Sequence, residues 1–418
     1  MTQPKFQVLY NPIQYGQPTS ITQFSPSAFF WANPYYILSL SIPSGAVTQL
    51  AAVPSGCGTC DLSFPVTADN ERAYSDFGGN STYQTHPLSV GPKPDSVVNY
   101  PPQALTDWFV QNLPDGRLLG FGSNSSGGYY IVTSDLDGST TPINHQFPSD
   151  ETVGAGPIYA SDGNYYGISM ARVRSGYLPG YLYRLTPAGV FTRILTMPFA
   201  TSPPESLIQG SDGNLYGLAQ DGGANGYGAF YQITMSGQYT LLYSFTSNNA
   251  YPGHLLQASD GNFYGITNIF NTPPTSGEIF QLTESGQYTP IYNVINQDGG
   301  SWFTSLIQGS DGRIYGTCTA GGTAGGGTIF ALDIGLPKPA PQALRFSPTQ
   351  GKPGDKIRIW GYNLLEPSVT FNGVAAPGAA TSGPNYIWAT VPSGATSGPI
   401  TVTTPGGASA TSASFTVE

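Results

Sequence analysis

The stretch Ser211-Asp212-Gly213-Asn214-Leu215-Tyr216-Gly217 recurs along this 418-residue chain. Close copies occupy residues 161–167, 259–265 and 310–316, and degenerate copies occur earlier. The aspartates of the six copies are 46 to 51 residues apart: Asp69, Asp115, Asp162, Asp212, Asp260 and Asp311. A tandem repeat therefore organises the first 336 residues.

One repeat, residues 206–245, predicts four short antiparallel strands. Residues 206–210 and 215–220 flank an Asp-Gly-Asn corner, whose residues suit the backbone of a tight hairpin. A glycine-rich loop then leads to a strand over 229–233, and Ser236-Gly237 turns the chain into a last strand. Four-stranded units at a period of about 40 to 50 residues are typical of β-propeller blades.

The length of the repeat region predicts seven blades, of which one, over residues 29–53, is degenerate. Residues 6–10 (FQVLY) resemble residues 239–243 (YTLLY), the outermost strand of a repeat. The last repeat ends after residues 328–332 and lacks such a strand. We therefore expect the N-terminal strand to complete the last blade, within a propeller domain over residues 1–336.

The repeat unit resembles the GloVer tandem repeat of bacterial, mostly surface or secreted proteins. The resemblance is good over residues 150–332, through the Ser-Asp-Gly-Asn-x-Tyr-Gly motif, the glycine loop and the Ser-Gly turn, and poor over residues 1–150. The unit is more distantly similar to the Asp-Gly-Asn-Leu-Trp repeat of streptogramin lyase-type seven-bladed propellers. The GloVer resemblance implies an extracellular or cell-surface protein and brings no defined activity.

A second domain is expected after a proline-rich linker, residues 337–342. Residues 343–418 show the alternation and turn spacing of a short-stranded, immunoglobulin-like β-sandwich. The motifs Phe346-Ser347-Pro348 and Trp360-Gly361-Tyr362-Asn363 resemble those of the IPT/TIG domain, which implies a spacer or interaction module. The predicted fold class is all-β, a seven-bladed β-propeller plus this C-terminal sandwich.

The composition excludes several classes of partner. Charged residues are only 9% of the chain, its net charge is −10, and no Lys/Arg cluster occurs, so nucleic acid is not an expected ligand. No apolar run of about 18 residues predicts a membrane span. The first residues predict no secretory signal, which leaves the route of export open.

The loops between second and third strands, and those between blades, are expected to form the binding face. They are longer and more variable than the Asp-Gly and Ser-Gly turns, and they combine aromatic with polar residues, which suits glycan or protein recognition. The ligand-binding candidates on them are Arg172, Arg174, Tyr177, Asp221, Asn225, Tyr227, Tyr251, His254, Phe270, Asp298 and Trp302. The repeated aspartates, in contrast, are expected to bind their own turns.

Catalytic and metal-binding motifs are absent from the sequence: it has three histidines, no HExxH pair, no G-x-S-x-G elbow and no P-loop. His254 aligns near the expected channel, and with Glu205 as acid it forms an enzyme alternative that the lyase-like resemblance implies. No cofactor is expected, although a divalent cation stays open for that alternative. Cys57 and Cys60 are a possible small disulfide loop, and Cys318 is left over.

Three functions remain open at this point. The first is a non-enzymatic extracellular or surface protein that binds or adheres to a glycan or protein ligand through its loop face. The second is a metal-dependent lyase or hydrolase with a site at the propeller channel. The third is a structural subunit of a surface fibre, layer or particle, which would assemble into oligomers.

Overall fold

The computed structural model describes most of the chain, and every described element is a β-strand, turn or irregular segment. No helix in this described part is long and apolar enough to cross a membrane. The description covers residues 3–418 except 12–16, 19, 34–35, 53–65, 70–71, 76–85, 90–105, 114–116, 124–128, 135–139, 149–150, 174–175, 178, 199–205, 247–250, 269–274, 300–302, 379 and 382–384.

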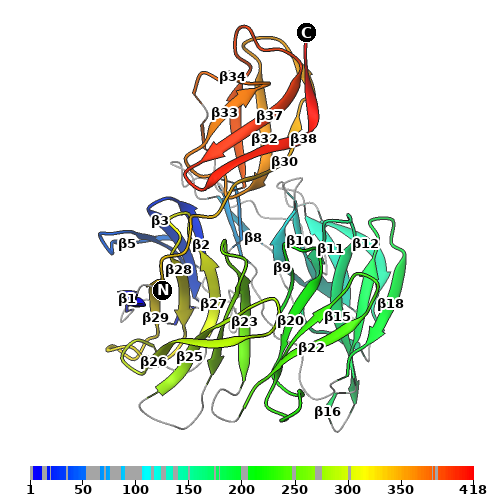
Figure 1. The fold of residues 1–418 in the computed structure, drawn as a ribbon, viewed down its shortest axis with the longest axis vertical. Coiled ribbons are helices and arrows are strands. Elements are labelled where there is room, and N and C mark those ends of the chain that lie inside the picture. Colours follow the sequence, from blue (N-terminus) through cyan, green and yellow to red (C-terminus); the bar gives the residue numbers. More distant parts are fainter. Residues whose placement is uncertain are drawn as a thin grey trace.

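The chain up to residue 333 forms a series of small antiparallel sheets, consistent with propeller blades (Figure 1). The first two contain β2 (Ser20–Ser25), β3 (Ala28–Asn33), β4 (Tyr36–Ser41) and β5 (Val47–Ala52), then β6 (Val66–Asp69), β7 (Arg72–Ser75) and β8 (His86–Ser89). The next two contain β9 (Thr106–Asn112), β10 (Leu118–Ser123), β11 (Tyr129–Ser134) and β12 (Thr140–Gln146), then β13 (Glu151–Val153), β14 (Ile158–Tyr159), β15 (Tyr165–Val173), β16 (Gly176–Tyr177), β17 (Tyr181–Leu185) and β18 (Phe191–Thr196).

The remaining sheets of this region have four strands each. One contains β19 (Ser206–Gln209), β20 (Leu215–Ala219), β21 (Ala229–Ile233) and β22 (Tyr239–Ser244), and the next β23 (Pro252–Gln257), β24 (Phe263–Asn268), β25 (Thr275–Leu282) and β26 (Tyr288–Ile295). The last contains β27 (Phe303–Gln308), β28 (Ile314–Cys318), β29 (Thr328–Asp333) and the N-terminal β1 (Lys5–Tyr10). The four strands that the sequence predicts over residues 206–245 are confirmed.

The innermost strands of these sheets contact one another in a closed cycle. The order is β2, β27, β23, β19, β14, β9, β6 and again β2. The first sheet begins at Ser20, earlier than the degenerate copy expected over residues 29–53. The sequence did not predict its first strand, because a Ser-Pro-Ser stretch stands where the other repeats have the Asp-Gly turn. At the other end of the repeat region, β1 pairs antiparallel with β29, so the N-terminal strand is the outer strand of the sheet that the last repeat forms.

A glutamine and a serine connect each of four successive junctions between sheets. Gln209, the last residue of β19, accepts a hydrogen bond from the backbone N–H of Ser161 at 2.8 Å, and its amide nitrogen donates to the Ser161 hydroxyl. The other three pairs repeat this geometry: Gln257 with Ser211, Gln308 with Ser259, and Gln23 with Ser310. The last pair joins residues from the two ends of the repeat region, so this clamp connects the first sheet to the last.

The repeated aspartate organises its own turn, as the sequence predicts. Asp212 Oδ1 accepts the backbone N–H of Asn214 at 3.0 Å, and Oδ2 accepts the Asn214 amide and the Tyr216 hydroxyl. Tyr216 is fully buried, and the copies at Asp162 and Asp260 make the same contacts, while at Asp311 the backbone N–H and guanidinium of Arg313 replace the two donors of the asparagine. The Asp-x-Asn-x-Tyr spacing therefore fastens each hairpin to the core of its sheet.

These turns predict an acid-sensitive fold. Burial acts to raise the pKa of the Asp162 and Asp212 carboxyls, but hydrogen bonds from the following asparagine and tyrosine outweigh it, and the pKa of each is lowered. A folded-state pKa below the unfolded one gives stability that is complete above the unfolded value of about 4 and is lost as pH falls below it. We expect the urea midpoint to decrease as the pH falls from about 5 to about 3, because the carboxyls of the unfolded chain become protonated in this range.

The variant Asp212→Asn tests this assignment. It should lower the free energy of unfolding by about 1–2 kcal/mol at pH 7, since it weakens the acceptor for three donors. It should also make the decrease of the urea midpoint at acid pH shallower. Glu366→Gln, which removes an exposed carboxylate of the C-terminal domain, is the control. An unchanged acid decline in Asp212→Asn would mean that other carboxylates cause it.

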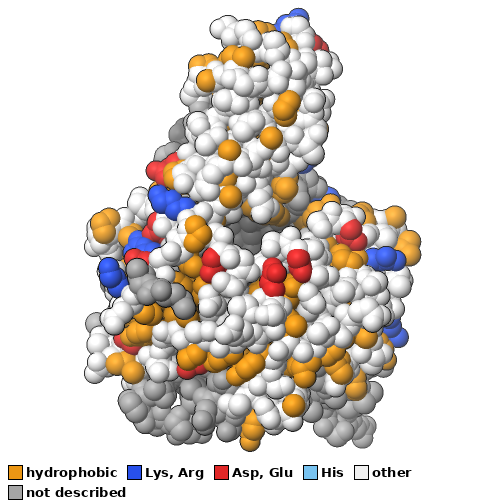
Figure 2. Space-filling model, viewed as in Figure 1, with side chains coloured by type: hydrophobic (Ala, Val, Ile, Leu, Met, Phe, Trp, Pro, Cys, Tyr) orange, Lys and Arg blue, Asp and Glu red, His pale blue; other side chains and the backbone are white. Residues whose placement is uncertain are grey.

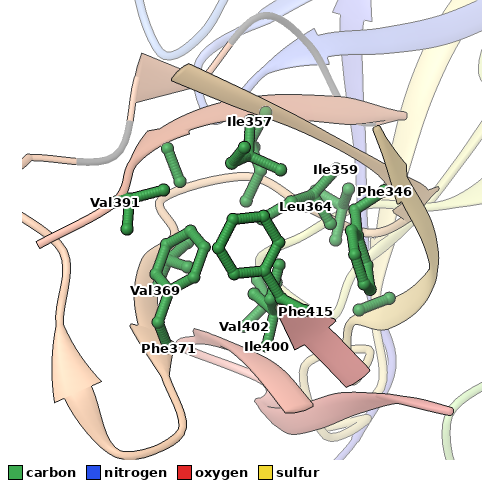
Figure 3. Packing of buried hydrophobic residues seen from close by; sticks show 13 residues of the cluster. Phe346, Ile357, Ile359, Leu364, Val369, Phe371, Val391, Ile400, Val402 and Phe415 are labelled. Carbon is green, nitrogen blue, oxygen red and sulfur yellow. The ribbon is translucent and has the colours of Figure 1, made fainter. Parts of the chain in front are cut away.

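The C-terminal domain consists of two curled sheets around one core. One contains β30 (Gln342–Ser347), β32 (Lys356–Tyr362), β36 (Tyr386–Thr390) and β35 (Ala380–Thr381). The other contains β31 (Gln350–Gly351), β38 (Gly407–Val417), β37 (Gly398–Thr404), β33 (Ser368–Phe371) and β34 (Val374–Ala375). Alternate residues of both sheets meet inside, where the Phe415 ring contacts Phe371 and Phe346 (Figure 3).

The linker places this domain over the face of the propeller that carries the Asp-Gly turns (Figure 1). The Pro337 carbonyl accepts hydrogen bonds from the Ser259 hydroxyl and from the Gln308 amide, the latter at 3.0 Å. The opposite face, where the loops between second and third strands lie, is left uncovered by the C-terminal domain (Figure 1).

Candidate functional site

Two glycine-rich loops on the uncovered face have the same conformation. In residues 221–228 the glycines with positive φ are Gly222, Gly223, Gly226 and Gly228, and in residues 319–327 they are Gly321, Gly322, Gly325 and Gly327. Each loop is closed by a backbone hydrogen bond from its last glycine to its first, at 3.2 and 3.0 Å. The expectation that these loops are variable is therefore wrong for this pair, because the repeat encodes their shape along with the strands.

Two of the predicted ligand-binding residues are engaged within their own sheets. The Asn225 amide donates to the Phe245 carbonyl at 3.2 Å. Asp298 accepts the Tyr292 hydroxyl at 2.8 Å and the Ile295 backbone N–H at 3.3 Å. Both side chains thus stabilise loop conformations. Asp221, at the start of the first glycine loop, is half-buried.

Among the candidates whose side chains are described, Tyr227 and Tyr251 are the exposed aromatic residues, at 46% and 43% of their full surface. Their loops adjoin, because a Cβ placed on Gly228 would lie 2.7 Å from Cδ of the Pro252 ring. Tyr227 precedes that glycine and Tyr251 precedes that proline, so the two tyrosines come from neighbouring sheets to one region of the uncovered face. Tyr251 has a φ of 58°, in the left-handed region that non-glycine residues seldom occupy.

His254 lies on β23, an innermost strand, and is half-buried. It is the extra residue of a β-bulge between Gly253 and Leu255 and has a φ of 41°. A bulge re-aims a side chain relative to the regular ladder, so His254 departs from the alternation of its strand. Its proposed acid partner, Glu205, lies outside the described residues.

The remaining predicted residues fall into two groups, those whose backbone alone is described and those outside the described part of the chain. Arg172 on β15 and Tyr177 on β16 are directly paired through the backbone, and only their backbone is described. Those that lie outside the described residues are Arg174, Phe270, Trp302, Cys57 and Cys60. Within the described part, no three His, Cys, Asp or Glu side chains form a group able to hold a metal ion.

Cys318 is a free, fully buried thiol on β28. Burial raises its pKa far above the usual range, and a weaker contribution from the Thr328 hydroxyl acts in the opposite direction. The thiol therefore stays protonated at neutral pH, and it packs as a small apolar side chain within the core of its sheet.

A cavity of about 850 Å³ lies on the other face, between the Asp-Gly turns and the C-terminal domain. Its walls come from the ends of three innermost strands and their turns, and from the first sheet of the C-terminal domain. Figure 2 shows the hollow beneath that domain, with acidic side chains along the facing edge of the propeller. The residues that line it are Ile158, Tyr159, Ala160, Ser161, Leu207, Ile208, Gln209, Gly210, Ser211, Gly213, Leu255, Leu256, Gln257, Gln342, Leu344 and Tyr362.

The sequence did not predict this cavity. One signal was present in the sequence. A glutamine stands two residues before the serine of the repeat motif, in Gln209-Gly210-Ser211 and in Gln308-Gly309-Ser310. The docking of the second domain, however, depends on linker contacts that no repeat pattern encodes.

Comparison with solved structures supports the propeller fold. Virginiamycin B lyase from Staphylococcus aureus aligns with a TM-score of 0.54 at 15% identity, covering 79% of this chain and 100% of the lyase chain. Oligogalacturonate lyase from Vibrio parahaemolyticus aligns with a TM-score of 0.53 at 11% identity, covering 80% of this chain and 94% of that one. At these identities the likeness concerns the fold alone.

Sequence comparison identifies the repeat. A search of curated proteins gives no significant match. A family model, the Gloeobacter/Verrucomicrobia repeat, matches residues 152–337, so the match ends at the linker and does not extend into the C-terminal domain. It confirms the resemblance that the motifs indicate: these residues carry that repeat, within a β-propeller built of tandem repeats.

Proposed function

We propose that this chain is a non-enzymatic binding protein of the cell surface or extracellular space, which holds a glycan on the loop face of its propeller. The observation that carries this proposal is the docking of the linker and C-terminal domain on the opposite face. Loops on a rigid scaffold are the usual place for binding residues, and the C-terminal domain does not cover the described loops of this face.

The architecture that we propose is a closed ring of seven blades followed by an IPT/TIG-type immunoglobulin-like sandwich. The cyclic contacts of the innermost strands, together with the β1–β29 pairing, support the ring. The two sheets of the C-terminal domain, which share one apolar core, support the sandwich. In this arrangement the C-terminal domain acts as a spacer that directs the loop face outward.

Tyr227 and Tyr251 are the proposed contacts. A sugar ring presents an apolar face that packs on an aromatic ring, while its hydroxyls need polar neighbours. The two exposed tyrosines lie on adjoining loops, and the half-buried Asp221 and His254, the latter on β23, are nearby in sequence, so both kinds of group are present.

A glycan array followed by calorimetry tests this function. We expect binding to at least one surface glycan, and a roughly tenfold weaker affinity, about 1.4 kcal/mol, for Tyr227→Ala and for Tyr251→Ala. Trp388→Ala, at an exposed tryptophan of the C-terminal domain, is the matched control and should leave binding unchanged.

Other outcomes would favour the alternatives. A blank array, together with capture of a surface protein that both tyrosine variants lose, would replace the glycan by a protein ligand. A metal-dependent turnover that His254→Ala abolishes would support a lyase or hydrolase at the channel. Spontaneous assembly into fibres or layers, unaffected by the tyrosine variants, would support a structural subunit.

A further inference from the structure

The linker occupies one of the glutamine–serine junctions and so shows what such a junction can bind. At the junction of Ser259 and Gln308, both side chains donate to the carbonyl oxygen of Pro337. The Leu336 carbonyl lies against the next turn, 2.6 Å from the position that a Cβ on Gly312 would take. Three positions, a serine, a glutamine and a turn glycine, thus form a seat for two successive peptide carbonyls.

The same three positions recur at the cavity, where no described segment of the chain lies on them. Ser161, Gln209 and Gly213 are the equivalents of Ser259, Gln308 and Gly312, and all three line the cavity. Gln209 holds Ser161 with the same two hydrogen bonds that Gln308 makes to Ser259. A Cβ placed on Gly213 would meet no atom of the described residues within 4 Å, whereas the one on Gly312 would meet the linker.

We propose that this cavity is a binding site for an extended, proline-containing peptide segment, which would dock at Ser161, Gln209 and Gly213 as the linker docks at the neighbouring junction. The Ser161 hydroxyl accepts from Gln209, as Ser259 does from Gln308, which leaves its hydrogen to donate to a peptide carbonyl. A proline-containing segment fits because its extended backbone exposes carbonyls and has few conformations to lose on binding.

The rest of the lining matches such a segment. Leu207 and Leu255 from the propeller and Leu344 from β30 give apolar surface for side chains. Leu344 is 37% exposed and is the bulged residue of its strand, which directs it out of the C-terminal sheet and toward the cavity. None of the described lining residues is charged, which disfavours a ligand that must bury a charge in the cavity. The volume lies in the range of about 300–1,000 Å³ typical of ligand sites.

The test uses the full chain and a synthetic peptide with the sequence of residues 334–341, acetylated and amidated at its ends. Isothermal calorimetry should give saturable binding with one peptide per chain. Gly213→Asn fills the seat with a side chain that tolerates positive φ, and it should weaken binding by about tenfold or more. Leu344→Glu, which introduces a charge into the apolar wall, should weaken it to a similar extent.

Matched variants keep the result interpretable. Gly394→Asn is the control for Gly213→Asn, because Gly394, in a turn of the C-terminal domain, has a similar φ of 82° and the same open surroundings but does not line the cavity. Leu241→Glu, at an exposed leucine of β22, is the control for Leu344→Glu. Both controls should bind the peptide like the unmodified chain, and circular dichroism should show all four variants folded.

Three results would overturn the proposal: no binding of the peptide at millimolar concentration, equal loss in the variants and their controls, or binding of neutral oligosaccharides in preference to the peptide. The glycan site on the loop face is independent of this one. Gly213→Asn should leave glycan binding intact, and Tyr227→Ala should leave peptide binding intact, so failure of one proposal is distinguishable from failure of the other.

Discussion

Replacing Gly167 by alanine is expected to lower the free energy of unfolding by about 3 kcal/mol. Gly167 lies on β15 directly opposite Tyr183 of β17, whose ring covers the glycine. A Cβ at this position would lie 2.2 Å from the Tyr183 hydroxyl oxygen and 2.5 Å from Cζ, and the three nearest atoms all belong to the Tyr183 side chain. The ring cannot move aside, because Tyr183 is fully buried against Phe147 and Phe191.

The same pair recurs in the following repeats, which gives the prediction a general form. Gly217 lies opposite Tyr231, Gly265 opposite Phe280, and Gly316 opposite Phe330, each with a Cβ position within 2.4 Å of the facing ring. An aromatic ring that packs over a cross-strand glycine covers its exposed backbone. The final glycine of the repeat motif is therefore needed because an aromatic ring of the third strand occupies the space of a Cβ. Its own backbone conformation is not the main reason.

A double-mutant cycle separates this clash from other causes. Tyr183→Leu removes the ring, so Gly167→Ala combined with Tyr183→Leu should cost clearly less than the sum of the single variants. Tyr183→Phe removes the hydroxyl but keeps Cζ, which lies 2.5 Å from the Cβ position, so it should give only partial relief. Urea unfolding of the four proteins measures the coupling, and strictly additive free energies would show that the alanine acts elsewhere.

The local elements were predictable from the sequence because each is built from neighbouring residues. The Asp212 turn, its hydrogen bond to Asn214 and the strands on both sides depend on contacts within five residues, and the motif states them directly. The same reasoning identified the repeated aspartates as structural. It also placed His254 on an innermost strand, although the bulge that displaces it depends on strand register.

The longer-range features needed the structure. The clamp between Gln209 and Ser161 joins residues 48 apart, and nothing in either residue names its partner. The peptide-sized cavity arises only where the linker turns the second domain onto the Asp-Gly face. Asn225 and Asp298 show the same limit for single residues, since their types suit a ligand site while their hydrogen bonds hold loops.

Removing β1 is the second change for which a large effect is expected. A chain that lacks residues 1–11 should lose roughly 4 kcal/mol of stability, because it loses both a ladder of backbone hydrogen bonds along β29 and the burial of Phe6. The Phe6 ring stacks on the rings of Tyr292 and Phe330, with centroids 4.5 Å and 4.9 Å apart, so it joins two adjacent sheets. Phe6→Ala alone should cost about 2 kcal/mol, since only the ring is lost.

The shortened chain should also associate, because β29 becomes an uncovered edge strand able to pair with another chain. Light scattering during refolding measures this, and a chain that lacks only residues 1–4, which precede the strand, is the control. A peptide of residues 3–11 added in excess should restore the unfolding midpoint by pairing with the vacated edge. If the shortened chain unfolds at the same urea concentration as the full one, β1 is dispensable, and closure of the ring depends on the Gln23–Ser310 clamp and the innermost strands instead.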